Sequence, residues 1–165
     1  MKILLALVVG LNLLLAQPIS LPTTTGTILN MDITSNTLKV AGYEDKYIIL
    51  EFFGKRCPVC TQIAPTISKL NNREDIQVIG VHMQDGIDDS SLNSFLNSKG
   101  VSFPVINYNQ SYAPYALAKG IATDWKLQIP FMLFIAPSGQ IVSYAMGFQS
   151  EDDILGAFRT YGGMK

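Results

Sequence analysis

The chain has 165 residues, of which 48% are hydrophobic and 15% charged, and its formal net charge is −1. This length corresponds to about one domain, which can bury a core without metal ions or disulfide staples. Because the net charge is close to zero and no basic block is present, the composition argues against nucleic-acid binding and against electrostatic attachment to membranes.

Residues 1–16 begin with Met1 and the positive charge of Lys2 and continue as an apolar stretch to Ala16. This stretch is shorter than the ~20 residues of a membrane span but fits the ~7–15 residues of a signal-peptide core. Ala16 provides a small residue for cleavage. We predict a signal peptide, with an uncleaved N-terminal anchor or a buried helix as alternatives, and the absence of a cysteine here excludes a lipoprotein. With a signal peptide or an anchor, the rest of the chain is exported.

Residues 17–26 contain two prolines and a run of threonines, which predicts a linker, and the folded domain is expected over residues 27–165. Long apolar runs without alternation predict strands that are buried on both faces. Strands, helices and strands alternate, which predicts an α/β domain around one mixed sheet. The expected elements are a hairpin over 27–40, a strand over 47–53, a helix over 58–70 with Pro65 inside it, a strand over 76–81, a helix over 88–99, an extended segment over 101–106, a loose helix over 110–122, strands over 129–135 and 141–146, and a helix from Ser150 to about Tyr161.

The chain has two cysteines, Cys57 and Cys60, and both lie in one Cys-x-x-Cys motif. A disulfide that encloses only two residues removes little chain entropy, so it adds little to stability. The pair is therefore predicted to be a redox-active dithiol. A structural disulfide and a zinc site are the alternatives, but two thiols and the single His82 do not supply four zinc ligands. We expect no metal and no cofactor.

Cys57 follows a predicted strand and precedes Pro58, which suits the first position of a helix because its missing N–H group would be unpaired there. A helix N-terminus presents free N–H groups and partial positive charge to the Cys57 sulfur, and both favour the reactive thiolate. Lys55 and Arg56 add positive charge nearby or are simply solvated. Cys60, one turn further along, is expected to be shielded and to act as the resolving thiol.

Glu51 is the one charged residue in the apolar run Tyr47–Phe53. Carboxylates are rarely buried unless they are paired or functional. Burial should raise the pKa of Glu51 and make it a proton acceptor for Cys60. An ion pair with a lysine elsewhere in the fold is the alternative. His82, by contrast, is expected to be structural.

Pro130 follows Ile129 at the start of a predicted strand, where a proline in a central ladder is awkward. A cis Ile129–Pro130 bond would turn the backbone toward the dithiol and leave ladder groups free for a substrate peptide. A trans proline on an edge strand is the alternative, and the residues alone favour it.

The segments EFFGKRCPVC and IPFMLFIAPSGQIV together resemble the thioredoxin superfamily. NSFLNSKGVSFPVI is similar to the insertion of the TlpA/ResA-like branch, the exported thiol-disulfide oxidoreductases related to cytochrome c maturation thioredoxins. The resemblance covers residues 28–161. It implies a thioredoxin-like three-layer α/β sandwich with a central mixed β-sheet. It also implies that Cys57 is the nucleophile, Cys60 the resolving cysteine, Pro130 the cis-proline and Glu51 the buried acid.

Three features bear on the direction of electron flow. Arg56 stands where many relatives have an aromatic residue, and the strand ending EFF resembles the oxidising DsbA branch, although DsbA relatives carry a larger helical insertion. Val59 replaces the histidine of strong oxidants. We therefore expect a monomeric periplasmic or otherwise extracytoplasmic reductase, with apocytochrome c among the candidate substrates. Its expected partners are exported proteins with disulfides and a membrane thiol-disulfide electron donor. A DsbA-like protein-disulfide oxidase and a non-catalytic thioredoxin-fold binding module remain as alternatives.

Overall fold

The computed structural model describes residues 18–165. The predicted signal peptide over residues 1–16 lies outside the described residues. Among the helices that are described, none is both long and apolar enough to span a membrane.

A five-stranded mixed sheet forms the centre of the domain, in the order β6-β5-β4-β7-β8. β4 lies in the middle, parallel to β5 and antiparallel to β7, while β6 pairs in parallel with β5 and β8 pairs antiparallel with β7. The strands are β4 (Tyr47–Phe53), β5 (Ile76–His82), β6 (Val105–Ile106), β7 (Phe131–Ile135) and β8 (Ile141–Met146). The predicted mixed sheet is confirmed.

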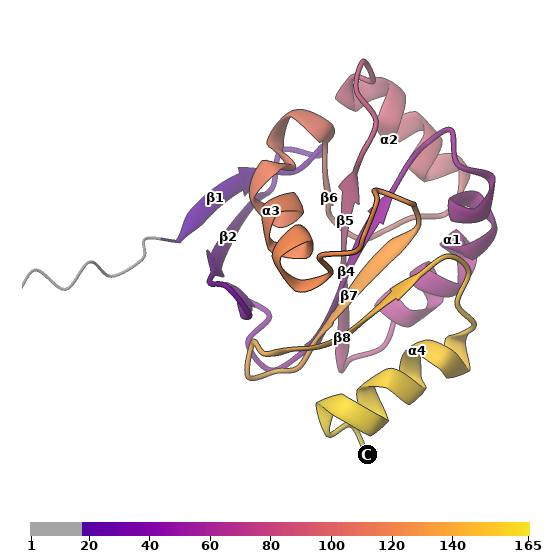
Figure 1. The fold of residues 1–165 in the computed structure, drawn as a ribbon. Helices are drawn as coiled ribbons and strands as arrows, with labels where there is room; N and C mark the ends of the chain where they lie inside the picture. The colour runs from indigo at the N-terminus through magenta and orange to yellow at the C-terminus, as the bar shows by residue number, and fades with distance from the viewer. Residues whose placement is uncertain (1–17) are drawn as a thin grey trace, which may run out of the picture.

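Helices cover both faces of this sheet, which confirms the predicted three-layer α/β sandwich (Figure 1). One face packs against α1, α2, α4 and the π-helix η2, and the other packs against α3 and the N-terminal strands. The helices are α1 (Pro58–Asn71), α2 (Asp89–Ser98), the 3-10 helix η1 (Tyr108–Gln110), α3 (Tyr112–Ile121), α4 (Glu151–Ala157) and η2 (Phe158–Gly162). α1 continues through Pro65, and Asp88 and Ser150 cap α2 and α4.

The side chains of β4 alternate between the two faces because successive residues of a strand point in opposite directions. Leu50 and Phe52 belong to the cluster that contains Trp125, whereas Ile49 and Phe53 belong to the cluster that contains the buried side of α1. Both faces are therefore apolar, which explains the continuous hydrophobic run in the sequence. Glu51 shares the parity of Ile49 and Phe53, so its carboxyl group faces α1.

The N-terminal region forms a second, three-stranded antiparallel sheet. It consists of β1 (Ile19–Pro22), β2 (Ile28–Ile33) and β3 (Leu38–Val40). β1 lies within residues 17–26, for which a linker was expected, and it pairs with β2 and buries Leu21. The difference has a simple cause: β1 is a four-residue edge strand with a proline at its end, where the missing N–H group does not interrupt a ladder.

Candidate active site

Cys57 and Cys60 form a disulfide at the N-terminus of α1. Cys57 is the N-cap residue with extended backbone angles, and Pro58 occupies the first helical position. The Cys60 N–H group donates to Cys57 Sγ at 3.1 Å. The structure thus confirms that the pair lies at the start of a helix, where the Cys60 N–H group and the partial positive charge of the helix N-terminus act on the Cys57 sulfur.

The Ile129–Pro130 bond is cis, which confirms one of the two explanations for Pro130 and makes the edge-strand explanation wrong. The Ile129 carbonyl oxygen lies 3.6 Å from Cys57 Sγ. The Pro130 carbonyl accepts a hydrogen bond of 2.9 Å from the N–H group of Gly147. The loop before β7 therefore adjoins the disulfide, and the turn after β8 is hydrogen-bonded to that loop.

Gly54 is a site residue that the sequence did not identify. A Cβ atom at this position would lie 2.8 Å from Cδ1 of Ile129 and 2.7 Å from Cδ of Gln84. Gln84 also accepts a hydrogen bond of 2.8 Å from the N–H group of Arg56. The absence of a side chain at Gly54 thus allows the loops that carry Cys57 and Ile129 to come together. Contacts between segments so far apart in the chain leave no local pattern in the sequence.

Glu51 is 3% exposed, and burial raises the pKa of its carboxyl group from 4.5 to about 8. Among residues 18–165, no lysine or arginine forms an ion pair with Glu51, so the predicted alternative of a structural ion pair is wrong. Cys60 and Glu51 line the same small cavity. The structure therefore combines a buried, neutral carboxyl group at pH 7 with the more deeply placed of the two cysteines.

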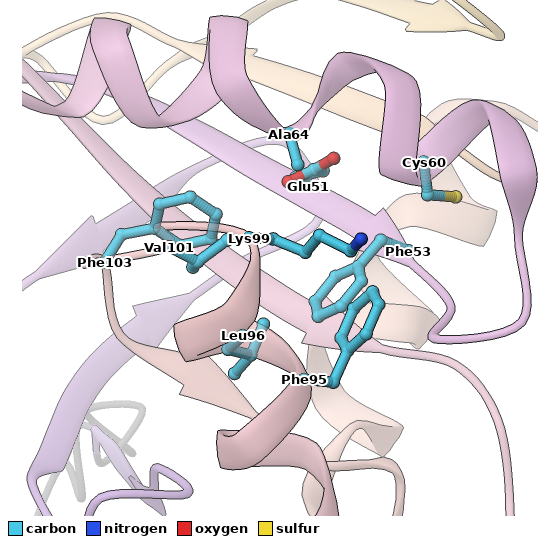
Figure 2. Close-up of a pocket in the computed structure, with 9 residues that line it drawn as sticks. All are labelled: Glu51, Phe53, Cys60, Ala64, Phe95, Leu96, Lys99, Val101 and Phe103. Atoms are coloured by element: carbon cyan, nitrogen blue, oxygen red, sulfur yellow. The ribbon is translucent and has the colours of Figure 1, made fainter.

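The cavity beside Glu51 measures about 20 Å³, which is room for one water molecule. Figure 2 shows the Glu51 carboxyl group beneath α1 and the Lys99 side chain extending across the pocket. The remaining walls are apolar and include Phe95 and Phe103. The Lys99 ammonium lies 5.9 Å from the centre of the Phe95 ring. This arrangement places the one cationic side chain of the pocket lining at its exposed edge.

Lys55 and His82 support the loop that precedes Cys57. The Lys55 ammonium donates to Ser91 Oγ at 2.7 Å, so this charge contacts α2. The Lys55 N–H group donates to His82 Nε2 at 3.4 Å, and His82 Nδ1 lies 3.0 Å from Asn107 Oδ1. Burial lowers the pKa of His82, although the hydrogen bond to Asn107 opposes this effect. His82 therefore has the structural position that was expected of it.

Within the part of the chain that the structure describes, no group of three or more His, Cys, Asp or Glu side chains could hold a metal ion. The site consists of the disulfide, the Ile129–Pro130 loop and the Glu51 cavity.

This fold, with a Cys-Pro-x-Cys disulfide at a helix N-terminus beside a cis-proline, is thioredoxin-like. Residues 17–144 match the AhpC/TSA family, and because this is more than half of the chain, the protein belongs to that family. The thioredoxin-like protein SkfH of Bacillus subtilis (strain 168) is 27% identical over 115 residues, which cover 67% of this chain and 76% of SkfH. With its disulfide-forming Cys57–Cys60 pair, the chain is a thiol-disulfide oxidoreductase of the thioredoxin-like class.

Solved structures agree with this fold. A thiol:disulfide interchange protein of the thioredoxin family from Chlorobium tepidum TLS superposes with a TM-score of 0.65 at 18% identity, over 88% of this chain and 94% of its own. A secreted Mycobacterium tuberculosis disulfide oxidoreductase, described as homologous to E. coli DsbE, superposes with a TM-score of 0.59 at 18% identity. The match covers 87% of this chain and 96% of the oxidoreductase. StoA from Bacillus subtilis superposes with a TM-score of 0.58 at 12% identity, over 84% of this chain and 94% of StoA.

The raised pKa of Glu51 predicts a pH-dependent stability. The folded disulfide form keeps a proton that the unfolded chain releases above pH 4.5, so the free energy of unfolding falls as the pH rises from 4.5 to about 8. The slope should reach about 1.4 kcal/mol per pH unit in that window and level off outside it. Glu51→Gln should remove the slope, as measured by urea unfolding of the oxidised protein at several pH values. The exposed Glu74→Gln is the matched control, and equal slopes in both variants would contradict the assignment.

Gly54→Ala should displace Ile129 and Gln84 because its methyl group would overlap both. Overpacking typically destabilises by about 1–3 kcal/mol. Both contacts are with the ends of side chains that can shift, so we expect a loss at the low end of this range, together with slower disulfide exchange at Cys57. Urea unfolding and the rate of insulin reduction measure the two effects. Gly120→Ala is the control, since its Cβ would meet no atom within 4 Å in α3, and a helical Gly→Ala change should stabilise slightly. If Gly54→Ala had the same stability and the same rate of insulin reduction as this control, the close contact at Gly54 would affect neither property.

Proposed function

We propose that this protein is exported and reduces disulfide bonds in other exported proteins, with Cys57 as the nucleophile. The position of the Cys57 sulfur carries the proposal. It caps α1, accepts the Cys60 N–H group at 3.1 Å and lies 3.6 Å from the Ile129 carbonyl oxygen. An attacking thiolate at this point would be stabilised by the helix N-terminus and would meet a substrate beside the Ile129–Pro130 loop.

The covalent steps would follow the usual course of thiol-disulfide exchange. The Cys57 thiolate attacks a substrate disulfide, whose bond breaks as one substrate sulfur leaves as a thiolate and takes a proton from solvent. The Cys60 thiolate then attacks Cys57 Sγ, and the second substrate sulfur leaves. Two electrons pass to the substrate, and the Cys57–Cys60 disulfide is formed. A dithiol donor must return two electrons before the next cycle.

Glu51 would carry the proton of Cys60 through this cycle. In the disulfide form the carboxyl group is neutral at pH 7, since its pKa is about 8, so it can protonate the Cys60 thiolate when a donor opens the disulfide. The resulting carboxylate takes the proton back when Cys60 attacks Cys57. The shared cavity supports this role because it has room for one water molecule that could relay the proton.

The direction of electron flow follows from how strongly the Cys57 thiolate is stabilised. A strong oxidant such as DsbA has a greatly stabilised reduced form. Here Val59 supplies no charge or hydrogen-bond donor beside the sulfur, and the Lys55 ammonium is engaged with Ser91 of α2. The helix N-terminus and the exposed Arg56 remain as the stabilising features. A weaker stabilisation of the thiolate favours a reductase over an oxidase.

The compartment and the partners are part of the same proposal. The apolar segment over residues 1–16 supports export by a signal peptide or retention by a membrane anchor, with the folded domain outside the cytoplasm. One similar structure is that of a secreted disulfide oxidoreductase. The proposed substrates are disulfides of exported proteins, including apocytochrome c in cytochrome c maturation. The electrons would come from a membrane thiol-disulfide donor, and the protein would act as a monomer without a cofactor.

The reduction potential of the Cys57–Cys60 pair tests the direction. A value closer to the ~−270 mV of thioredoxin than to the ~−120 mV of DsbA supports a reductase, and a value near DsbA would establish the oxidase instead. Val59→His should raise the potential by about 30 mV or more, a tenfold change in the equilibrium constant, because a cation beside Cys57 stabilises the thiolate. Val59→Gln is the uncharged control. Equilibration with glutathione buffers measures all three proteins.

Trapping tests the roles of the two cysteines. Cys60→Ala should accumulate mixed disulfides between Cys57 and exported proteins, because the resolving thiol is absent. Cys57→Ala should accumulate few, because the remaining Cys60 is shielded. Non-reducing electrophoresis followed by mass spectrometry identifies the adducts. A non-catalytic binding module would form no adducts in either variant, and equal adducts in both would contradict the assigned roles.

A further inference from the structure

His82 is the last residue of β5 and takes part in none of the exchange steps, yet it contacts the loop that carries the nucleophile. It is the one histidine of the chain, and its side chain is fully buried. A buried imidazole needs a partner for each ring nitrogen, because an unpaired polar group away from water costs free energy. Nδ1 lies 3.0 Å from Asn107 Oδ1, and Nε2 accepts the Lys55 N–H group at 3.4 Å. His82 thus connects the start of η1 with the loop before Cys57.

Asn107 determines which nitrogen of His82 carries the proton. Its amide nitrogen donates to the Ile87 carbonyl at 2.9 Å and to Asp89 Oδ1 at 2.7 Å. Its amide oxygen accepts the N–H group of Tyr108 at 2.8 Å. These three partners fix the orientation of the amide, so the atom that faces the ring is an oxygen, which can only accept. Nδ1 of His82 must therefore donate, and in the neutral ring Nε2 then carries a lone pair.

The two N–H groups that directly precede Cys57 are held by two side chains from one short segment. The Lys55 N–H group donates to His82 Nε2, and the Arg56 N–H group donates to Gln84 Oε1 at 2.8 Å. At 3.4 Å the bond to His82 is long, so it is easily broken. Cys57 is the N-cap residue of α1, so the backbone of this loop decides how its sulfur meets the helix N-terminus.

A second proton on His82 would reverse the role of Nε2. The nitrogen would become a donor and would face the donating N–H group of Lys55, so this hydrogen bond would be lost. The Gln84 side chain is a hydrogen-bond partner that favours the protonated ring. Its oxygen, however, already accepts the Arg56 N–H group. Protonation of one buried ring would therefore act on both N–H groups before Cys57.

The surroundings of His82 keep the ring neutral at pH 7. Burial is the largest cause that lowers its pKa below the ordinary 6.5. Two neighbouring cations lower this pKa further, and two neighbouring amides raise it. The groups that face the ring from the loop after β4, the segment after β5, η1 and α2 are the cations of Lys55 and Arg56, the amides of Gln84 and Asn107 and, behind Asn107, the Asp89 carboxylate. The folded protein therefore takes up this proton only below pH 6.5.

We propose that His82 is a positioning residue for Cys57: its neutral, Nδ1-protonated ring holds the Lys55 N–H group, and protonation of the ring releases the loop. The sulfur of Cys57 is then well placed for exchange at neutral pH and less well placed in acid. The inference rests on the proposed role of Cys57 as the nucleophile and adds a proton-sensitive control of that role. His82 exchanges no proton with either sulfur and takes no part in the covalent steps.

NMR spectroscopy of the oxidised protein tests the hydrogen bonds directly. Neither cysteine titrates in the disulfide, and the single histidine gives one set of ring signals. We expect the neutral ring to carry its proton on Nδ1. The Lys55 N–H shift should change with the same midpoint as the ring, below pH 6.5, and should lose this change in His82→Gln.

The matched control for the Lys55 N–H group lies at the other end of β5. The Val78 N–H group donates to Asn71 Oδ1 at 3.0 Å, an acceptor that does not titrate, so its shift should stay constant. A neutral ring with its proton on Nε2 would overturn the proposal. A Lys55 shift that ignores the titration of His82 would overturn it as well.

Exchange rates in a Cys60→Ala background test the consequence for Cys57. The reagent is dithiodipyridine, a disulfide that reacts with thiols in acid as well as at neutral pH, and the released pyridinethione is followed by its absorbance. His82→Leu should react about threefold more slowly at pH 7, as the loss of one hydrogen bond would give. His82→Gln should restore most of this rate, because its amide oxygen can accept the Lys55 N–H group.

The pH profile separates positioning from a general effect on the fold. As the pH falls through the titration of His82, the rate of the parent protein relative to His82→Gln should fall about threefold. A constant ratio would overturn the proposal. A rising ratio would do the same, because it would show an imidazolium that acts as a charge on the thiolate. A Cys57 that is unreactive in every variant would refute the nucleophile itself, whereas the Lys55 shift is measured in the disulfide form and does not depend on exchange.

Discussion

The site depends on the hydrogen bond of 3.1 Å by which the Cys60 N–H group holds Cys57 Sγ at the N-terminus of α1. It exists because α1 starts directly at Cys57, and Pro58 defines that start since it needs no partner for an N–H group. β4 holds this junction at the centre of the sheet, where both of its faces are buried. Gly54 then allows the Ile129 loop to reach the same sulfur. One backbone junction thereby orients the dithiol and places it beside its proposed substrate surface.

The burial of Glu51 in the same strand lowers the stability of the fold. A carboxyl group in the middle of β4 interrupts an otherwise apolar strand, and within the described residues no cation forms an ion pair with it. Its burial destabilises the fold as the pH rises toward its pKa of about 8, and an apolar residue would avoid this loss. Sequences tend to depart from local rules of stability where function requires it. Glu51 shares a cavity with Cys60, and the proton transfer proposed for Glu51 would account for this departure.

Much of this fold could be predicted from the sequence because its strongest signals are local. The apolar runs of β4 and β5 reveal strands buried on both faces, and Cys57-Pro58 marks the start of α1. The cis bond at Pro130 was expected only through the family resemblance, since the residues alone favoured a trans edge-strand proline. β1 was missed because two prolines obscured a short edge strand. Gly54 owes its importance to contacts between distant segments, which no local pattern shows.

We infer that the two thiols of the reduced protein are unequal and that Cys57 is the more reactive. Alkylation of the reduced protein by iodoacetamide across a range of pH, with each cysteine followed by mass spectrometry, tests it most directly. We expect Cys57 to react first, with a midpoint clearly below the pH of about 8.5 expected for an unperturbed cysteine, and Cys60 to react later and more slowly. Equal rates at the two cysteines, or a Cys57 midpoint at 8.5 or above, would contradict it.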